Sequence, residues 1–162
     1  MRLPLFVYGT LIPGQPNDHY VAAHLLAQEP AWFAHGRLYT FETFPMLIET
    51  AEGQPIHGRL LTLNPVTYDA VLQQLDELEE YDPADETNSP YLRRQREVQT
   101  ADGRTHTAWV YLGQPHFVTF GLPHIPSGDW VQHTAEQANQ DSMAAWWQTH
   151  GVKLLFGQKG EE

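Results

Sequence analysis

The chain has 162 residues, a formal net charge of −11 at pH 7 and no cysteine. This length suits one domain with a substantial core, and the absence of cysteine excludes disulfides, thiolate nucleophiles and cysteine-ligated zinc. A nucleic-acid partner needs a basic surface, which this acidic composition does not predict. No apolar run approaches the roughly 18 residues of a membrane span. We therefore expect one cytoplasmic domain over residues 1–162 that binds neither nucleic acid nor a membrane.

Short apolar segments separated by turn residues fill the first third of the chain. Residues 3–8 form an apolar run and are expected to be a strand. The run is too short for a signal peptide and is interrupted by Pro4. Asn17 suits the N-cap of a helix over residues 20–28, whose one face carries Tyr20, Val21, His24, Leu25 and Gln28. Three strands are then expected, at 31–39, 46–49 and 55–63. Gly36, inside the first of them, indicates a bulge or a close approach.

The segment 64–81 is expected to be an amphipathic helix, with Asn64 at its N-cap and Pro65 at its first helical position. Its apolar residues recur at three- and four-residue spacing and form one stripe: Tyr68, Val71, Leu72, Leu75 and Leu78. At about 100° per residue, Glu79 falls on this stripe, whereas Glu77 and Glu80 point away. One carboxylate of a dense acidic run is therefore directed at the core.

That position of Glu79 has two interpretations. Burial disfavours the charged form of a carboxyl and raises its pKa, and the helix C-terminus acts in the same direction. A carboxyl with a pKa near neutrality suits a general base. A structural role fits the pattern as well, because Glu79 could turn outward in a frayed last turn or pair with an arginine.

Beyond this helix the chain returns to strands. Residues 82–90 are polar and rich in turn residues, so a loop is expected there. Two alternating segments, 91–100 and 104–112, flank Ala101-Asp102-Gly103 and predict an antiparallel hairpin. Because strands outnumber helices, we expect an α+β domain: a curled antiparallel or mixed sheet with the amphipathic helix packed at one side.

A final helix is expected at about 132–149, and the last residues are expected to be loose. The adjacent Trp146 and Trp147 could anchor this helix or bury themselves against a second copy of the chain. A homodimer is therefore one expected assembly.

The loop Tyr8-Gly9-Thr10-Leu11 directly follows the first strand. Glycine lets a ligand approach the backbone closely, and successive free N–H groups after a strand can form a donor site for a carbonyl or carboxylate oxygen. An ordinary strand-ending turn is the alternative. The nine histidines do not suggest a metal, since His19 and His24 are five residues apart and the others are scattered. We therefore expect no metal site.

Several short segments stand in a characteristic order along residues 3–130. They are Phe6-Val7-Tyr8-Gly9-Thr10-Leu11, Gly36-Arg37-Leu38-Tyr39, Phe44-Pro45-Met46-Leu47, His57-Gly58-Arg59-Leu60, Leu75-Asp76-Glu77-Leu78-Glu79-Glu80-Tyr81, Tyr91-x-Arg93, Ala108-Trp109-Val110-Tyr111 and Ile125-Pro126-Ser127-Gly128-Asp129-Trp130. In this order and spacing the chain resembles the gamma-glutamylcyclotransferase-like superfamily. Residues 131–162 fall outside the resemblance and are expected to be a helical extension.

The resemblance implies a small barrel-like α+β fold with a polar cavity beside the helix. It implies that the backbone of Tyr8-Gly9-Thr10-Leu11 holds a γ-glutamyl group and that Glu79 is the acid/base. Further candidate substrate contacts are Tyr39, Tyr91, Arg93 and Tyr111. Each tyrosine could equally be a core residue, and Arg93 could hold a substrate carboxylate or only neutralise Glu79.

The implied activity is that of a γ-glutamyl cyclotransferase, which releases 5-oxoproline and a free amine or amino acid from a small γ-glutamyl compound without a cofactor. The alternative is a non-catalytic binding or interaction module of the same fold, because fold alone does not fix function. Relatives often carry glycine after the catalytic glutamate, and Glu80 here could alter its pKa or the substrate preference. If Glu79 is catalytic, it should face a cavity floored by residues 8–11.

Overall fold

The computed structural model describes residues 2–41 and 43–148. The chain divides into two compact units, Met1–Trp130 and Val131–Glu162, and each is described by itself. Among the described residues, no helix is both long enough and apolar enough to cross a membrane.

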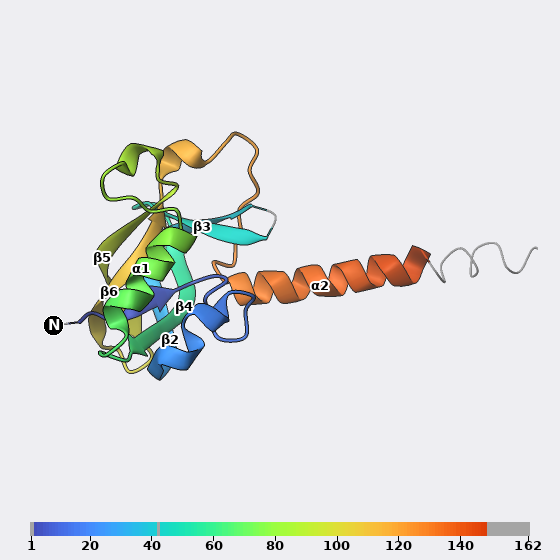
Figure 1. The fold of residues 1–162 in the computed structure, drawn as a ribbon. Helices are drawn as coiled ribbons and strands as arrows, with labels where there is room; N and C mark the ends of the chain where they lie inside the picture. The colour runs from blue at the N-terminus through green and yellow to red at the C-terminus, as the bar shows by residue number, and fades with distance from the viewer. Residues whose placement is uncertain (1, 42, 149–162) are drawn as a thin grey trace, which may run out of the picture. The chain divides into compact units, whose positions relative to one another are not determined.

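The first unit is built on a closed sheet (Figure 1). Its strands are β1 Leu5–Val7, β2 Leu25–Phe41, β3 Phe44–Glu49, β4 Gln54–Leu63, β5 Tyr91–Thr100 and β6 Thr105–Gly113. The order is β3-β2-β4-β1-β6-β5, and β2 pairs again with β5, so five strands close into a barrel and β3 extends it from β2. All pairings are antiparallel except that of β1 with β6. The expected α+β fold with a mixed, barrel-like sheet is confirmed.

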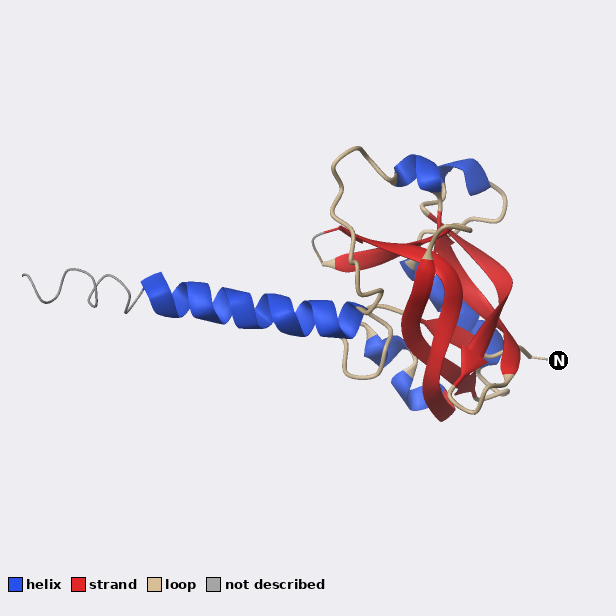
Figure 2. Ribbon diagram, turned by 180° about the vertical axis from the view of Figure 1, so that it is seen from behind, coloured by secondary structure: helices blue, strands red, loops and turns tan. Residues whose placement is uncertain are grey.

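Alternation along β1 divides the buried side chains into two groups. Leu5 and Val7 join the stripe of α1, Tyr68–Leu78, in one group. Phe6 belongs to the other, with residues such as Ile56 and Val110 on the opposite side of the sheet. The helix lies against the barrel (Figure 2), and the apolar stripe predicted for it is the face that it buries.

The helix α1 is shorter at its start than the sequence suggested. The N-cap position is Thr67, without a side-chain cap, and not Asn64. Asn64 instead accepts a hydrogen bond from the Val66 N–H at 2.9 Å within a turn. An asparagine carbonyl can satisfy a nearby backbone donor in a turn as well as at a cap, which is why the pattern misplaced the helix start.

A left-handed residue ends α1. Glu79 is the C-cap, and Glu80 follows with φ 55°. The Tyr81 N–H donates to the Asp76 carbonyl at 2.8 Å and the Glu80 N–H to the Glu77 carbonyl at 3.1 Å. This is the Schellman arrangement, whose left-handed position favours glycine. The left-handed backbone thus explains why a glycine is expected after the glutamate. In this chain Glu80 occupies that position.

The prediction of a helix over residues 20–28 is wrong. Two short 3-10 helices, η1 Asp18–Tyr20 and η2 Ala22–His24, stand there instead. The chain then enters β2, where Leu25 pairs with Leu63 and Gln28 with Leu61 of β4. Pairing with a long neighbouring strand outweighs a helical pattern in a segment this short.

The strands expected at 46–49, 55–63, 91–100 and 104–112 agree with the molecule to within about two residues, whereas the expected loop 82–90 contains a short 3-10 helix, Glu86–Asn88. β5 and β6 form the predicted hairpin, with Gln99 opposite Thr105. The register of β2 shifts between Phe33 and Gly36, which is the predicted irregularity. The helix α2 spans Trp130–Trp146 and belongs to the second unit from Val131 on. Residue 149, the predicted end of this helix, and the last residues, which were expected to be loose, lie outside the described residues.

Candidate active site

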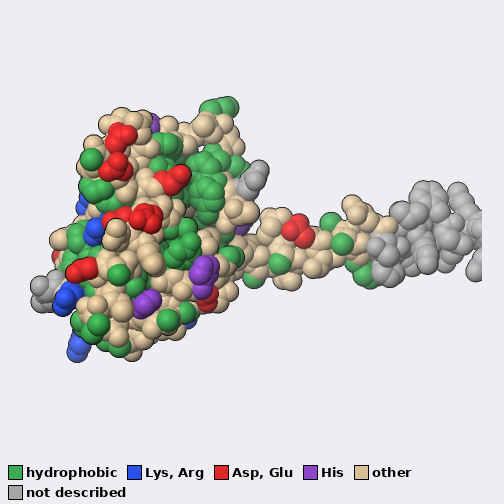
Figure 3. All heavy atoms as spheres, viewed as in Figure 1, with side chains coloured by type: hydrophobic (Ala, Val, Ile, Leu, Met, Phe, Trp, Pro, Cys, Tyr) green, Lys and Arg blue, Asp and Glu red, His purple; other side chains and the backbone are tan. Residues whose placement is uncertain are grey.

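A cavity of about 540 Å³ opens in the first unit, where the end of α1 faces the loop after β1. Its floor includes Tyr8, Gly9, Thr10 and Leu11. Its apolar walls come from separate segments: Phe41, Phe44, Pro45, Met46, Leu78, Pro90 and Phe117. On this side of the molecule, acidic side chains gather over the end of α1 and the loop that follows, next to a group of hydrophobic side chains (Figure 3).

Glu79 lines this cavity together with residues 8–11. Its position is fixed by the last hydrogen bond of α1, in which the Glu79 N–H donates to the Leu75 carbonyl at 2.9 Å. Burial raises the pKa of the Glu79 carboxyl from 4.5 to about 7. Within the described residues no arginine or lysine forms an ion pair with it. A carboxyl of this kind can both accept and return a proton near neutral pH.

The loop after β1 lines the same cavity with Tyr8, Gly9, Thr10 and Leu11. Ile12 N–H donates to the Gly9 carbonyl at 3.0 Å, and the Asn17 N–H donates to the Thr10 carbonyl at 2.9 Å. These bonds fix the loop from its carbonyl side. Over the described residues, the N–H groups of Gly9, Thr10 and Leu11 donate no hydrogen bond to the protein. The loop therefore lines the cavity with residues whose N–H groups have no partner in the described protein, and such groups can serve as donors to an oxygen atom.

A side chain at Gly9 would block this arrangement. A Cβ atom there would lie 2.4 Å from Cγ of Pro45, at the start of β3. The glycine lets the loop pack against β3 and lets a ligand approach its backbone. The Gly9–Pro45 contact thus joins the floor of the cavity to one of its walls.

Three of the predicted tyrosines line the cavity: Tyr8, Tyr91 and Tyr111. Burial raises the pKa of each hydroxyl, and the charge of Glu79 adds to each shift. The Tyr8 hydroxyl donates to the Tyr111 carbonyl at 2.6 Å, and the Tyr91 hydroxyl donates to the Pro45 carbonyl at 2.7 Å. These hydroxyls share the cavity with Glu79 as neutral groups, and the hydroxyls of Tyr8, Tyr91 and Tyr111 each already donate their hydrogen within the protein.

Arg93 and Tyr39 are not among the residues that line the cavity. Arg93 forms a two-pronged ion pair with Asp76, at 2.8 and 3.2 Å, and lies over the Trp109 ring at 4.4 Å. The expectation that it might neutralise Glu79 is therefore corrected, because Asp76 occupies its guanidinium. Asp76 also accepts a hydrogen bond from the Tyr111 hydroxyl at 2.7 Å, so it positions a wall of the cavity.

The sequence did not single out several other lining residues. The adjacent Phe44, Pro45 and Met46 lie in a segment that carried the family resemblance, but no role followed from the pattern. Asn88 and Phe117 end two short 3-10 helices, η3 Glu86–Asn88 and η4 Pro115–Phe117, which are too short for a periodicity to indicate which side chains turn inward. Only the closed fold brings these residues together with Glu79.

A separate surface group has ligand atoms at metal-binding distances. Glu29, Asp102 and His106 bring one such atom each within 4.8 Å of the others. The two carboxylates are exposed, and the His106 Nε2 atom lies 3.2 Å from the Thr100 hydroxyl. None of the three lines the cavity, so the chemistry around Glu79 does not involve them.

The fold and cavity define a small α+β barrel protein with a carboxyl of near-neutral pKa beside free backbone donors. Residues 5–132 match the family described as Gamma-glutamyl cyclotransferase, AIG2-like, and the chain belongs to this family. Membership supports an enzyme of the γ-glutamyl cyclotransferase type.

Two relatives and one solved structure illustrate the similarity. The chain is 32% identical over 108 residues to the Gamma-L-glutamyl-butirosin B gamma-glutamyl cyclotransferase of Niallia circulans, an alignment that covers 67% of this chain and 65% of that protein. It is 32% identical over 132 residues to a Vibrio cholerae protein named "Putative gamma-glutamylcyclotransferase", covering 82% of this chain and 98% of that one. A crystal structure of an AIG2-like protein from Mus musculus matches with a TM-score of 0.57 and 24% identity, over 76% of this chain and 86% of that chain. This last likeness shows the fold.

Proposed function

We propose that the protein converts a γ-glutamyl compound into 5-oxoproline and a free amine, with Glu79 as the acid/base. One observation carries the proposal: a half-buried carboxyl, whose desolvation raises its pKa to about 7, shares a cavity with the free N–H groups of Gly9, Thr10 and Leu11. The name of the Niallia circulans relative specifies a γ-L-glutamyl compound as its substrate, which agrees with this class of chemistry.

The reaction is an intramolecular aminolysis. The neutral α-amine of the glutamyl group attacks its γ-amide carbon, so that a new C–N bond closes a five-membered ring. The Glu79 carboxylate takes the proton that the attacking nitrogen loses. The original amide C–N bond then breaks, and the leaving nitrogen takes this proton from Glu79. One bond forms, one bond breaks, and the enzyme returns to its starting state.

The remaining groups of the cavity bind and orient the substrate. The N–H groups of the 9–11 loop would donate to the glutamyl oxygens and to the oxyanion that develops during attack. Nucleophile and electrophile belong to one molecule, so holding the chain in a folded conformation supplies much of the rate enhancement. Tyr8, Tyr91 and Tyr111 would keep Glu79 in a poorly solvated environment and maintain its raised pKa.

The test is the formation of 5-oxoproline from a panel of γ-glutamyl dipeptides and γ-glutamylamines. We expect Glu79→Gln to lower kcat by about 100-fold or more, since general acid/base groups contribute on this scale. In the wild type, kcat/KM should rise with pH through about 7 as Glu79 ionises.

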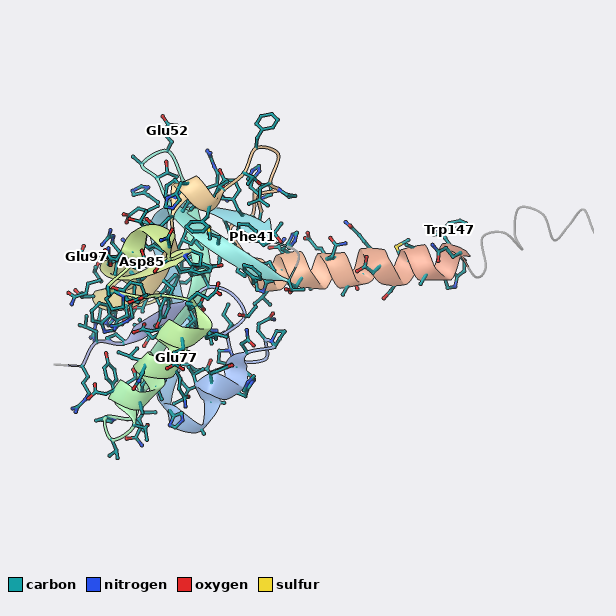
Figure 4. All side chains as sticks on the ribbon, turned by 45° about the horizontal axis from the view of Figure 1, so that its top comes forward. Phe41, Glu52, Glu77, Asp85, Glu97 and Trp147 are labelled. Carbon is teal, nitrogen blue, oxygen red and sulfur yellow. The ribbon has the colours of Figure 1, made fainter. Side chains whose placement is uncertain are left out.

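The matched control is Glu77→Gln, because Glu77 lies on the exposed face of the same helix (Figure 4). This variant should keep wild-type turnover. Full activity of Glu79→Gln would remove its assigned role. If the wild type bound panel members without forming product, the protein would be a binding module of the same fold.

A further inference from the structure

Glu80 combines two features that are rarely found together. It is the one non-glycine residue with a positive φ among the described residues, at 55°, and it lines the cavity immediately after Glu79. Glycine suits this left-handed position far better than glutamate does. Disfavoured backbone conformations concentrate at functional sites. The side chain at position 80 is therefore the feature to explain.

The charges around the cavity are all of one sign. Among its described lining residues, Glu79 and Glu80 are the charged side chains, and there is no lysine, arginine or histidine. Arg93 cannot supply the missing cation, because it is bound to Asp76 outside this lining. A leaving group with a carboxylate, such as an amino acid, would meet no positive partner and two negative ones.

The walls of the cavity that Glu80 lines suit a different leaving group. Phe41, Phe44 and Phe117 line the cavity with aromatic surface, which packs against alkyl chains and attracts cations. Glu80 is exposed, so its carboxylate meets the part of a ligand nearest solvent. An alkyl stem that ends in an ammonium group matches both surfaces.

We propose that Glu80 selects substrates whose leaving amine carries a second, cationic amino group and no carboxylate. This inference rests on the proposed function and adds the class of leaving group to it. The reacting amide lies at Glu79, the alkyl stem lies along the phenyl rings, and the distal ammonium pairs with the Glu80 carboxylate. The net charge of −11 also favours the approach of a cationic compound.

Three substrates of matched length test the proposal: the mono-γ-glutamyl derivative of a linear diamine, that of an n-alkylamine, and a γ-glutamyl amino acid. We expect kcat/KM to decrease in this order. The kcat/KM of the diamine derivative should exceed that of the alkylamine derivative by about fivefold, which is the scale of one partly exposed ion pair. Added salt should reduce this ratio, because it screens the pair. Equal kcat/KM values for the diamine and alkylamine derivatives, or a preference for the amino acid derivative, would overturn the proposal.

Variants at position 80 separate charge from backbone. Glu80→Gln keeps a side chain at the left-handed position and removes the charge, whereas Glu80→Gly removes both the charge and the disfavoured conformation. The diamine-to-alkylamine ratio should fall to about one in both variants. It should keep its wild-type value in Glu77→Gln, which removes an equal charge from α1 outside the cavity. A ratio that persists in Glu80→Gln, or that falls equally in Glu77→Gln, would refute the role of Glu80.

Failure of the proposed function would be recognised separately. If none of the three compounds yields 5-oxoproline, the same series is measured by calorimetric titration of wild type and Glu80→Gln. Preferential binding of the diamine derivative that is lost in Glu80→Gln would retain the selectivity of the cavity without catalysis. Equal binding in both proteins would overturn the inference.

Discussion

Glu79 links the chemistry of the cavity to the stability of the protein. Its carboxyl has a pKa of about 7 in the folded state against an ordinary value of 4.5. Below pH 4.5 the group is neutral in both folded and unfolded chains, so folding loses nothing. As the pH rises towards 7, the unfolded chain ionises freely while the folded chain resists, and the free energy of unfolding falls. Above pH 7 the loss is complete.

Glu79→Gln should remove this dependence. The shift from 4.5 to about 7 corresponds to at most about 3 kcal/mol, so the variant should gain up to that amount over the wild type at pH 8 and little at pH 4.5. Urea unfolding at several pH values measures the difference. Glu77→Gln, which alters an exposed side chain of the same helix, should show no comparable trend. Parallel pH profiles for wild type and Glu79→Gln would contradict the assigned burial.

For single residues, the sequence predicted the direction of a side chain better than its contacts. Helical periodicity placed Glu79 on the inward stripe, because side-chain direction in a helix follows from residue spacing. It could not reveal that Asp76, three residues earlier, binds Arg93 and Tyr111, since those contacts depend on where β5 and β6 cross the helix. The role of Glu80 was seen as a matter of charge alone, and its left-handed backbone was not predicted.

Among the elements, the loop after β1 and the start of β3 act as one unit through Gly9 and Pro45. Gly9→Ala should reduce the free energy of unfolding by about 1–3 kcal/mol, because the new methyl group would lie 2.4 Å from Cγ and 2.9 Å from Cδ of Pro45. Equilibrium unfolding in urea checks this value. Turnover should fall as well, since the displaced loop carries the free N–H groups.

A double-mutant cycle separates the clash from a general effect of alanine. Pro45→Ala removes Cγ and Cδ but keeps the carbonyl that accepts from the Tyr91 hydroxyl. The double variant should therefore be more stable than the sum of the two single changes predicts, by about 0.5–3 kcal/mol. Strict additivity would show that the two residues do not press on each other.

Element boundaries show where local pattern is sufficient. The β5–β6 hairpin was predicted because its turn and its alternation both lie within one short stretch. Residues 20–28 were misassigned because their conformation is set by β4, a strand distant in the sequence. Asn64 was misplaced for a related reason: one side-chain carbonyl can serve a turn or a helix cap, and only the path of the chain decides between them.

For the whole molecule, the named lining of the cavity lies between residues 6 and 117, within the first compact unit. A chain of residues 1–132 should therefore fold and form 5-oxoproline at a rate close to that of the full chain. Loss of activity with retained folding would show that the C-terminal unit contributes to catalysis.

The same two chains test the predicted homodimer by sedimentation, because Trp146 and Trp147 are half exposed in the full chain and absent from the shorter one.

The pattern of the sequence predicted the class of fold, and the family resemblance predicted its barrel-like sheet, but neither predicted the strand order. An α+β sheet with one packed helix follows from counting and patterning the elements. The order β3-β2-β4-β1-β6-β5 and the second pairing of β2 with β5 do not, because they depend on contacts between distant segments. The aromatic walls of the cavity were missed for the same reason.

The length of β2 has a consequence for how the protein is made. This strand pairs with β3, β4 and β5, and the last of these pairings joins Ala31 to Thr100, which the ribosome adds much later. A nascent chain can form the β2–β3–β4 sheet early, but its exposed edges stay open until β5 and β6 emerge. Such edges are sites of intermolecular association. The interval before the barrel closes is therefore when a newly synthesised chain has most need of a chaperone.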